Sequence, residues 1–276
     1  MEDLSKFLET HKSIAKIFPK AWFESELQKS QEQMHLLAKQ FTFDDHPYDN
    51  AISHHLFGHL EDNLELLSEE IQKKGRILRE LKKSEEYESI NGQIEICSFF
   101  KKLGFDVELE PNIPRSKKIS DIKISDGEFS AYIEVRTLFD REGDIIFQST
   151  NSTISTISDH SLQILQDRIK QKSQQLSEHH PGIIALNLYN ISRTSHIEAA
   201  FYAIARECPI ISGLFLYRHY FNSEGCRILM KYLGNPYANK QLPKSIEREL
   251  EKNSVEIGTW TKENIDIIEK RDANQY

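Results

Sequence analysis

Apolar residues recur at helical intervals through the first 82 residues, where few segments alternate as strands do. The spacing predicts helices over residues 1–18, 24–39 and 52–81. The apolar positions of the third helix fall near heptad spacing: Leu60, Leu64, Leu67, Ile71, Ile77 and Leu81. A helix of this length needs a partner for its apolar face, which is either the protein core or a second copy of the chain.

A different pattern begins after residue 83. Residues 86–102 keep helical spacing and end at Leu103-Gly104-Phe105, where glycine suits the end of a helix. A strand from Phe105 and a basic loop follow, and then comes the alternating stretch ISDIKISDGEFSAYIEVRT, residues 119–137. This stretch is typical of a β-hairpin.

The dipeptide Asp126-Gly127 predicts the turn of this hairpin, because both central residues of a type I′ turn need positive φ. With these two as the loop, the expected pairs are Ser125 with Glu128, Ile124 with Phe129, Ile122 with Ala131, and Asp121 with Tyr132. Successive residues on a strand point to opposite faces, so the register sorts the side chains. One face is then apolar: Ile122, Ile124, Phe129, Ala131, Ile133 and Val135.

The other face of the predicted hairpin is mostly polar: Asp121, Lys123, Ser130, Glu134 and Arg136, with Ile119 and Tyr132 among them. Asp121 and Glu134 become diagonal neighbours, about 7–8 Å apart at the backbone. Charged groups on a central hairpin are unfavourable unless they are paired or functional. We therefore treat this face as a candidate site.

The rest of the chain alternates between helical and strand patterns. We expect a helix over 161–178, a buried strand at GIIALNLYN, a helix over 195–207 and a strand at PIISGLFLYRHY. Together these elements predict an α/β fold with a central mixed β-sheet flanked by helices, preceded by an N-terminal all-helical region. The expected divisions are a helical region over 1–82, an α/β core over 83–235 and a C-terminal extension packed on the core over 236–276.

Asp121, followed after twelve residues by Glu134-Val135-Arg136, resembles the PD-(D/E)xK nuclease superfamily. The core of that family is a helix, a strand, a hairpin that bears Asp and Glu-x-Lys, a helix and a strand. The order over residues 86–189 is similar, so the resemblance implies a restriction-endonuclease-like core. Two residues depart from the family pattern: Ser120 stands where Pro often precedes the Asp, and Arg136 stands where the family has Lys.

The resemblance implies hydrolysis of phosphodiester bonds in DNA or RNA, with Asp121 and Glu134 as ligands of Mg²⁺ or Mn²⁺. Such an ion generates a hydroxide nucleophile and stabilises charge that develops on phosphorus. Arg136 is expected to stabilise charge, although an arginine stays protonated and cannot act as a base. Lys123, two residues from Asp121 on the same face, is our candidate for a relocated ammonium group.

The family usually carries a Glu on the helix before the hairpin. On a helical wheel, Gln93 falls in the middle of the apolar face of residues 86–102, whereas Glu88 and Glu95 fall on the opposite, solvated side. We match Gln93 to the family position and keep Glu95 as the alternative. The competing interpretation of Gln93 is a polar residue tolerated at an interface.

Basic residues near the hairpin are candidates for binding nucleic-acid phosphates. Arg115, Lys117 and Lys118 lie in the loop before Asp121, and Lys172 lies on the helix over 161–178. A solvated run of charge is the competing interpretation of these residues.

Composition restricts the function further. The chain has 276 residues, 38% of them hydrophobic, and a net charge of −8, so nucleic-acid binding would depend on local patches. Cys97, Cys208 and Cys226 are isolated, which is typical of reduced thiols. With no signal-peptide core and no apolar run of 18 residues, we expect a cytoplasmic protein without a membrane span.

Three functions fit these residues. The first is a metal-dependent nuclease. The second is a catalytically degenerate relative that keeps the fold and binds nucleic acid or a protein. The third is a scaffold that dimerises through its N-terminal helices, in which Asp121, Glu134 and Arg136 satisfy one another as a buried ion-pair network.

Overall fold

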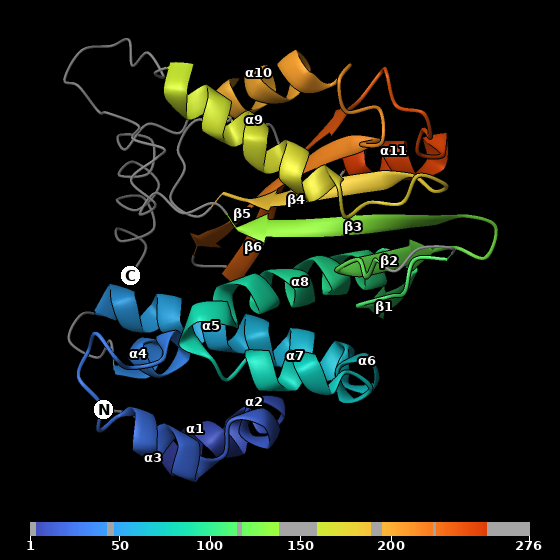
Figure 1. Ribbon diagram of the computed structural model, residues 1–276. Coiled ribbons are helices and arrows are strands. Elements are labelled where there is room, and N and C mark those ends of the chain that lie inside the picture. Colours follow the sequence, from blue (N-terminus) through green and yellow to red (C-terminus); the bar gives the residue numbers. More distant parts are fainter. Residues whose placement is uncertain are drawn as a thin grey trace. The chain divides into compact units, whose positions relative to one another are not determined.

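The computed structural model describes residues 4–42, 47–114, 118–137, 159–188, 195–222 and 225–252. The chain forms two compact units (Figure 1). The first is Met1–Gly104, to which Glu224–Cys226 is assigned, and the second is Phe105–Ser223 with Arg227–Tyr276. The first unit thus continues past residue 82 and includes the helix that precedes the sheet in the sequence.

The first unit is helical. Its elements are α1 (Leu4–Thr10), α2 (Lys12–Ile17), α3 (Lys20–Glu26), α4 (Leu36–Thr42), α5 (Pro47–Leu66), α6 (Ser68–Gln72), α7 (Gly75–Glu80) and α8 (Ser84–Lys102). The helical character of this region is confirmed, but each of the three long helices expected before residue 82 is broken. Non-helical backbone at His11, Leu67 and Lys74 separates the shorter helices.

The helix expected over 24–39 is wrong for a local reason. The Glu26 carboxylate accepts a hydrogen bond from the His35 backbone N–H at 3.0 Å, which folds the intervening residues into turns. Bonds of this kind between a side chain and the backbone compete with helix formation.

The core of the helical unit forms within a single chain. Phe7 packs against Phe23, Phe41 and Phe57 with ring centroids 4.7–5.8 Å apart. All six residues with near-heptad spacing, from Leu60 to Leu81, are buried. Their burial requires no second copy of the chain, so dimerisation through these helices stays a prediction without support from this face.

The second unit is an α/β structure. Its elements are β1 (Asp106–Leu109), β2 (Ile122–Ser125), β3 (Ser130–Thr137), α9 (Asp159–Ser173), β4 (Gly182–Asn187), α10 (Ser195–Ile204), β5 (Gly213–Asn222), β6 (Gly225–Gly234) and α11 (Lys244–Lys252). The six strands form one sheet in the order β1–β2–β3–β4–β5–β6. Strands β1, β2 and β3 pair antiparallel, whereas β3, β4 and β5 pair parallel. The predicted mixed sheet flanked by helices is therefore confirmed, and β6 is a strand that the pattern did not predict.

The hairpin of β2 and β3 turns one residue later than expected. Gly127 has φ +93° and no positive φ occurs at Asp126 or Glu128, as in a type II′ turn with Gly127 first. The Asp126 side chain accepts hydrogen bonds from the backbone N–H groups of Glu128 and Phe129 at 3.2 and 3.0 Å. Those bonds and the single positive φ favour this turn over the predicted type I′ turn.

The register therefore differs from the predicted one. Ser125 pairs with Ser130, Ile124 with Ala131, Lys123 with Tyr132, and Ile122 with Ile133. Each partner has moved by two residues, so every side chain keeps its predicted face. One step beyond the last pair, Asp121 comes opposite Glu134 instead of diagonal to it.

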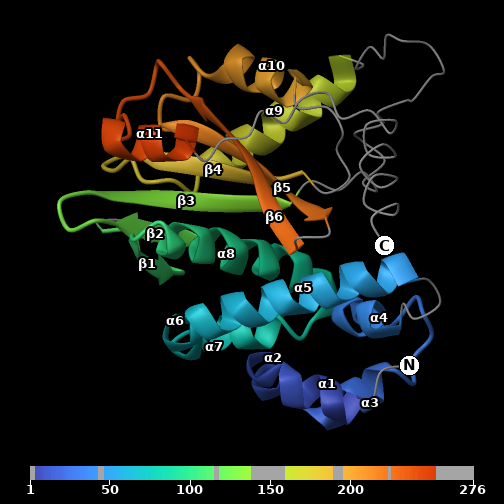
Figure 2. The ribbon, with the colours of Figure 1, turned by 180° about the vertical axis from the view of Figure 1, so that it is seen from behind.

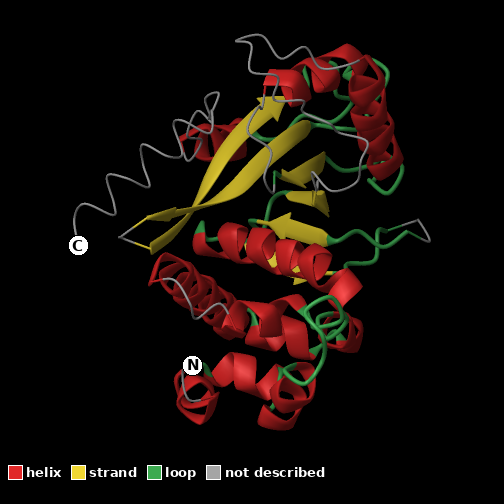
Figure 3. Ribbon diagram, turned by 90° about the vertical axis from the view of Figure 1, so that its left-hand side faces the viewer, coloured by secondary structure: helices red, strands yellow, loops and turns green. Residues whose placement is uncertain are grey.

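Helices α9 and α10 lie together over one face of the sheet (Figures 1 and 3), and this face carries Glu134. Glu134 pairs in register with Ile184 of β4, and Ile184 belongs to the core that α9 and α10 form with this face. Other members of that core are Leu165, Ile169, Phe201, Ile204, Leu214 and Leu216. On the far side of the unit α11 lies near β6, where Tyr232 hydrogen-bonds Glu247 at 3.5 Å (Figure 2).

Among the described helices, none combines the length and the apolar character that a membrane span requires.

Candidate active site

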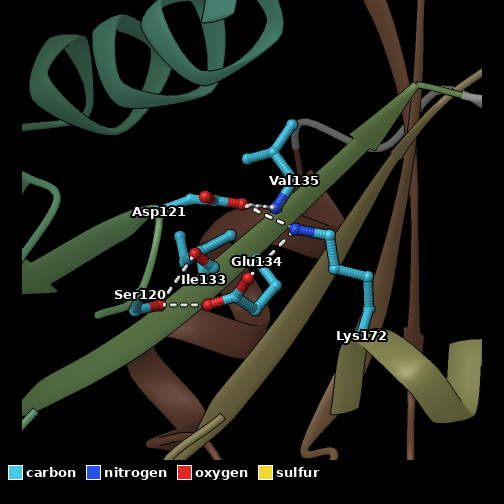
Figure 4. Close-up of polar contacts among 6 residues, drawn as sticks. All are labelled: Ser120, Asp121, Ile133, Glu134, Val135 and Lys172. Atoms are coloured by element: carbon cyan, nitrogen blue, oxygen red, sulfur yellow. Dashed lines mark hydrogen bonds and ion pairs between the residues drawn. The ribbon is translucent and has the colours of Figure 1, made fainter. Parts of the chain in front are cut away.

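Two carboxylates meet at β3, an inner strand of the sheet. Glu134 lies within β3 with only 1% of its side chain exposed, and Asp121 lies just before β2 with 18% exposed. Hydrogen bonds hold Asp121 through its backbone carbonyl group and through its side chain. Its carbonyl oxygen accepts from Glu110 N at 2.9 Å, and its Oδ2 accepts from Val135 N at 2.8 Å (Figure 4).

Lys172, in the last turn of α9, joins the two carboxylates. Its Nζ lies 3.1 Å from Asp121 Oδ2 and 3.1 Å from Glu134 Oε2 (Figure 4). We predicted Lys172 as a phosphate-binding residue if its helix face borders the hairpin, with solvent exposure as the alternative. Only 19% of its side chain is exposed, and its ammonium contacts both acids of the hairpin. These contacts in the described part of the chain use two of the three donors that an ammonium group has.

The segment that follows α9 makes a close contact with the start of β4. Gly182 begins β4, and a Cβ there would come within 2.8 Å of the Leu176 side chain. The segment after α9 therefore packs against β4 at this point. Glycine at position 182 allows this close approach, four residues beyond Lys172 on the chain at Leu176.

Ser120 completes the cluster. We noted it only as a departure from the Pro of the family and predicted no role for it. Its Oγ lies 2.8 Å from Glu134 Oε1 and 3.1 Å from the Ile133 carbonyl oxygen, and the residue is buried. Strand alternation would have turned this side chain toward the apolar face. Its hydrogen bonds instead place the hydroxyl beside Glu134, at a position that lies before β2 begins.

The surroundings of Glu134 perturb its ionisation. Burial, followed by the charge of Asp121, raises the pKa of the Glu134 carboxyl from its ordinary 4.5 to about 7, against the opposing effects of Lys172 and Ser120. When both acids are ionised, Lys172 is the one ammonium among the described residues that is paired with the two carboxylates. Glu134 therefore takes up or releases a proton near neutral pH, and a further cation at the site would favour its ionised form.

The face of the sheet that carries Glu134 also carries Arg136, two residues later on β3, and Lys123 on β2. Arg136 is half-buried beside Leu186 of β4. Lys123 is paired with Tyr132 on one side and with Glu108 on the other. The lysine that reaches both carboxylates is Lys172, so the contact that we expected of Lys123 is made from α9.

The basic loop before Asp121 is described only in part. Arg115 and Lys117 lie outside the described residues. Lys118 is exposed, and its Nζ lies 3.5 Å from the Leu176 carbonyl oxygen, which links the loop to the segment after α9. Phosphate binding by these residues stays a prediction.

Gln93 and Glu95 belong to α8 in the helical unit, whereas the two carboxylates belong to the α/β unit. Both α8 residues are buried, and Asn91 Nδ2 donates to Glu95 Oε1 at 2.8 Å. The predicted solvated position of Glu95 is therefore wrong. The wheel failed there because both sides of α8 are covered over residues 92–98.

The donor set fits Mg²⁺ or Mn²⁺ better than Zn²⁺. In the described ranges, no three His, Cys, Asp or Glu side chains gather as a metal cage. Mg²⁺ is commonly held by one or two carboxylates together with waters and substrate phosphate. Asp121 and Glu134 would hold such an ion, and the excess of negative charge at the pair favours a cation there.

Fold and site together define a mixed α/β protein with a Ser–Asp–Glu–Lys cluster between a hairpin and the helix that follows it. Comparisons of the chain with protein-family models, with curated proteins and with solved structures gave no match.

Proposed function

We propose that this protein hydrolyses phosphodiester bonds of DNA or RNA with Mg²⁺ or Mn²⁺ held by Asp121 and Glu134. The observation that carries the proposal is the Lys172 ammonium, 3.1 Å from both carboxylates. The family motif has a lysine at its third position, where this chain has Arg136. Lys172 supplies an ammonium group beside the two acids in its place. The cluster then contains an aspartate, a glutamate and a lysine, although the lysine comes from a helix.

The order of the elements supports the same proposal. Helix α8, strand β1, the β2–β3 hairpin, helix α9 and strand β4 follow one another along the chain. This is the order that the resemblance to PD-(D/E)xK nucleases implies, and the two acids fall on the hairpin as that resemblance requires.

Each side chain has a distinct part in the proposed reaction. A bound ion supplies an activated water and neutralises charge on the phosphate. Lys172 neutralises the carboxylate pair and has a third donor for a water or a phosphate oxygen. Arg136, on the same sheet face, stabilises the charge of the substrate backbone. In the overall reaction the oxygen of one water bonds to phosphorus, one P–O ester bond breaks, and the leaving oxygen takes up a proton.

A cleavage assay tests this function. Labelled single- and double-stranded DNA and RNA are incubated with the wild-type protein and Mg²⁺ or Mn²⁺, with chelator as the blank and Glu134→Gln as the inactive variant. We expect metal-dependent cutting of at least one substrate by the wild type and none by the variant. Equal cutting by the two proteins would assign the activity to another site or to a contaminant.

A further inference from the structure

Ser120 is a buried hydroxyl aimed at one oxygen of Glu134. Its Oγ is 2.8 Å from Oε1 and 3.1 Å from the Ile133 carbonyl oxygen, both within the α/β unit (Figure 4). The Lys172 ammonium occupies the other oxygen, Oε2. The two carboxylate oxygens of Glu134 therefore have different donors, one neutral and one charged.

The backbone holds Ser120 firmly in this position. Its N–H donates to the Pro111 carbonyl oxygen at 3.2 Å, and the preceding residue, Ile119, forms a bridge with Asn112. The next residue, Asp121, accepts from Glu110 N. A proline at position 120 would lack both the backbone donor and the hydroxyl, so serine supplies two bonds here that proline cannot make.

A carboxylate held at both oxygens cannot rotate about its terminal bond without losing a hydrogen bond. Removal of the Ser120 hydroxyl would leave Oε1 buried without this donor and would release that rotation. Hydrogen bonds to metal-binding carboxylates fix the orientation of the ligand, and their loss typically weakens metal binding 10- to 100-fold.

We propose that Ser120 is a positioning residue, which holds Glu134 so that Oε2 faces Lys172 and the cation. This inference rests on the proposed metal-dependent function and adds a residue to it. In this proposal Ser120 acts on the site through its hydrogen bond to Glu134.

Mn²⁺ affinity of the full-length chain tests the proposal. We expect Ser120→Ala to raise the apparent Kd for Mn²⁺ by roughly 10- to 100-fold and Ser120→Thr, which keeps the hydroxyl, to restore it to within a few-fold of wild type. Ser212→Ala is the matched control. Ser212 is also buried, and its Oγ accepts from Gly182 N and donates to the Lys240 carbonyl oxygen, but the bonds of its hydroxyl involve neither carboxylate. Its Mn²⁺ affinity should equal that of wild type.

The outcomes separate this proposal from the function on which it rests. If the wild type binds Mn²⁺ and Ser120→Ala binds it equally well, the positioning role is overturned while the metal site stands. Weakening in both Ser120→Ala and Ser212→Ala, or no rescue by Ser120→Thr, assigns the effect to general loss of packing and also overturns the role. A wild type that binds no Mn²⁺ overturns both proposals.

Discussion

Replacing Lys172 with Met is expected to reduce metal-dependent cleavage by roughly 10²- to 10³-fold, the usual effect of removing one group that stabilises charge in a transition state. The methionine keeps the length of the side chain but removes the ammonium between Asp121 and Glu134. The two acids then face each other without their shared cation. Single-turnover cleavage at saturating Mn²⁺ measures the loss.

Lys170→Met controls for the removal of positive charge from α9. Lys170 lies two residues earlier on the same helix and pairs with Glu207 at 2.7 Å, away from the carboxylates. Its variant should cut as wild type does. Lys172→Arg is the second comparison, because it preserves the charge and keeps the acids paired while changing the geometry of the donors. Cleavage by folded Lys172→Met at the wild-type rate would remove Lys172 from the reaction.

Replacing Glu134 with Gln is expected to stabilise the α/β unit at alkaline pH in the absence of metal. The pKa of Glu134 is raised to about 7 in the folded protein, from an ordinary value of 4.5. The folded state thus holds this proton more tightly than the unfolded state does between these two values. The stabilisation from the protonated group is complete below pH 4.5 and is lost as the pH rises through 7.

At pH 8 the wild type must therefore bury an ionised carboxylate that the Gln variant lacks. We expect the variant to be more stable by on the order of 1–3 kcal/mol at pH 8 and to differ little at pH 5. Thermal unfolding in chelator at both pH values measures the difference. Added Mg²⁺ should raise the melting temperature of the wild type alone, because binding favours the folded state. A variant that is less stable than wild type at pH 8 would show that Glu134 is held there as a stabilising member of an ion-pair network.

The sequence was sufficient to predict which face of the hairpin carries the acids. Side chains alternate with a period of two residues, and the error in the register is also two residues. The predicted faces are therefore correct although the predicted pairs are wrong. The predicted turn type is wrong because two turns are possible, one centred on Asp126-Gly127 and one on Gly127-Glu128. Both place a glycine at a position of positive φ. The hydrogen bonds of the Asp126 side chain decide between them, and those bonds depend on the folded turn.

The partner of the two acids was not predictable in the same way. Lys172 follows Glu134 by 38 residues, and no local pattern fixes the height or rotation of α9 above the sheet. The Leu176 side chain packs closely against Gly182 at the start of β4, four residues after Lys172. A glycine at the start of a buried strand is the one signal that could have indicated a close approach at this point.

The helical unit shows the limits of periodicity more plainly. The apolar positions from Leu60 to Leu81 are buried as expected, yet they lie on α5, α6 and α7 and on the residues that follow them rather than on one helix. A helical-wheel projection assigns residues to faces correctly only within one unbroken helix. It also takes no account of tertiary contacts, which is why Glu95 is buried on α8 despite its predicted exposure.

The direct test of the central claim is the number of Mn²⁺ ions bound per chain, measured from the electron paramagnetic resonance signal of free Mn²⁺. This number does not depend on the choice of substrate. We predict that the wild type binds Mn²⁺ and that Asp121→Asn abolishes or greatly weakens the binding. Asp167→Asn, an exposed position on α9, should leave it unchanged. Equal Mn²⁺ binding by the wild type and Asp121→Asn, or no binding by either, would contradict a metal site at Asp121 and Glu134 and leave the Lys172 cluster as a structural ion-pair network.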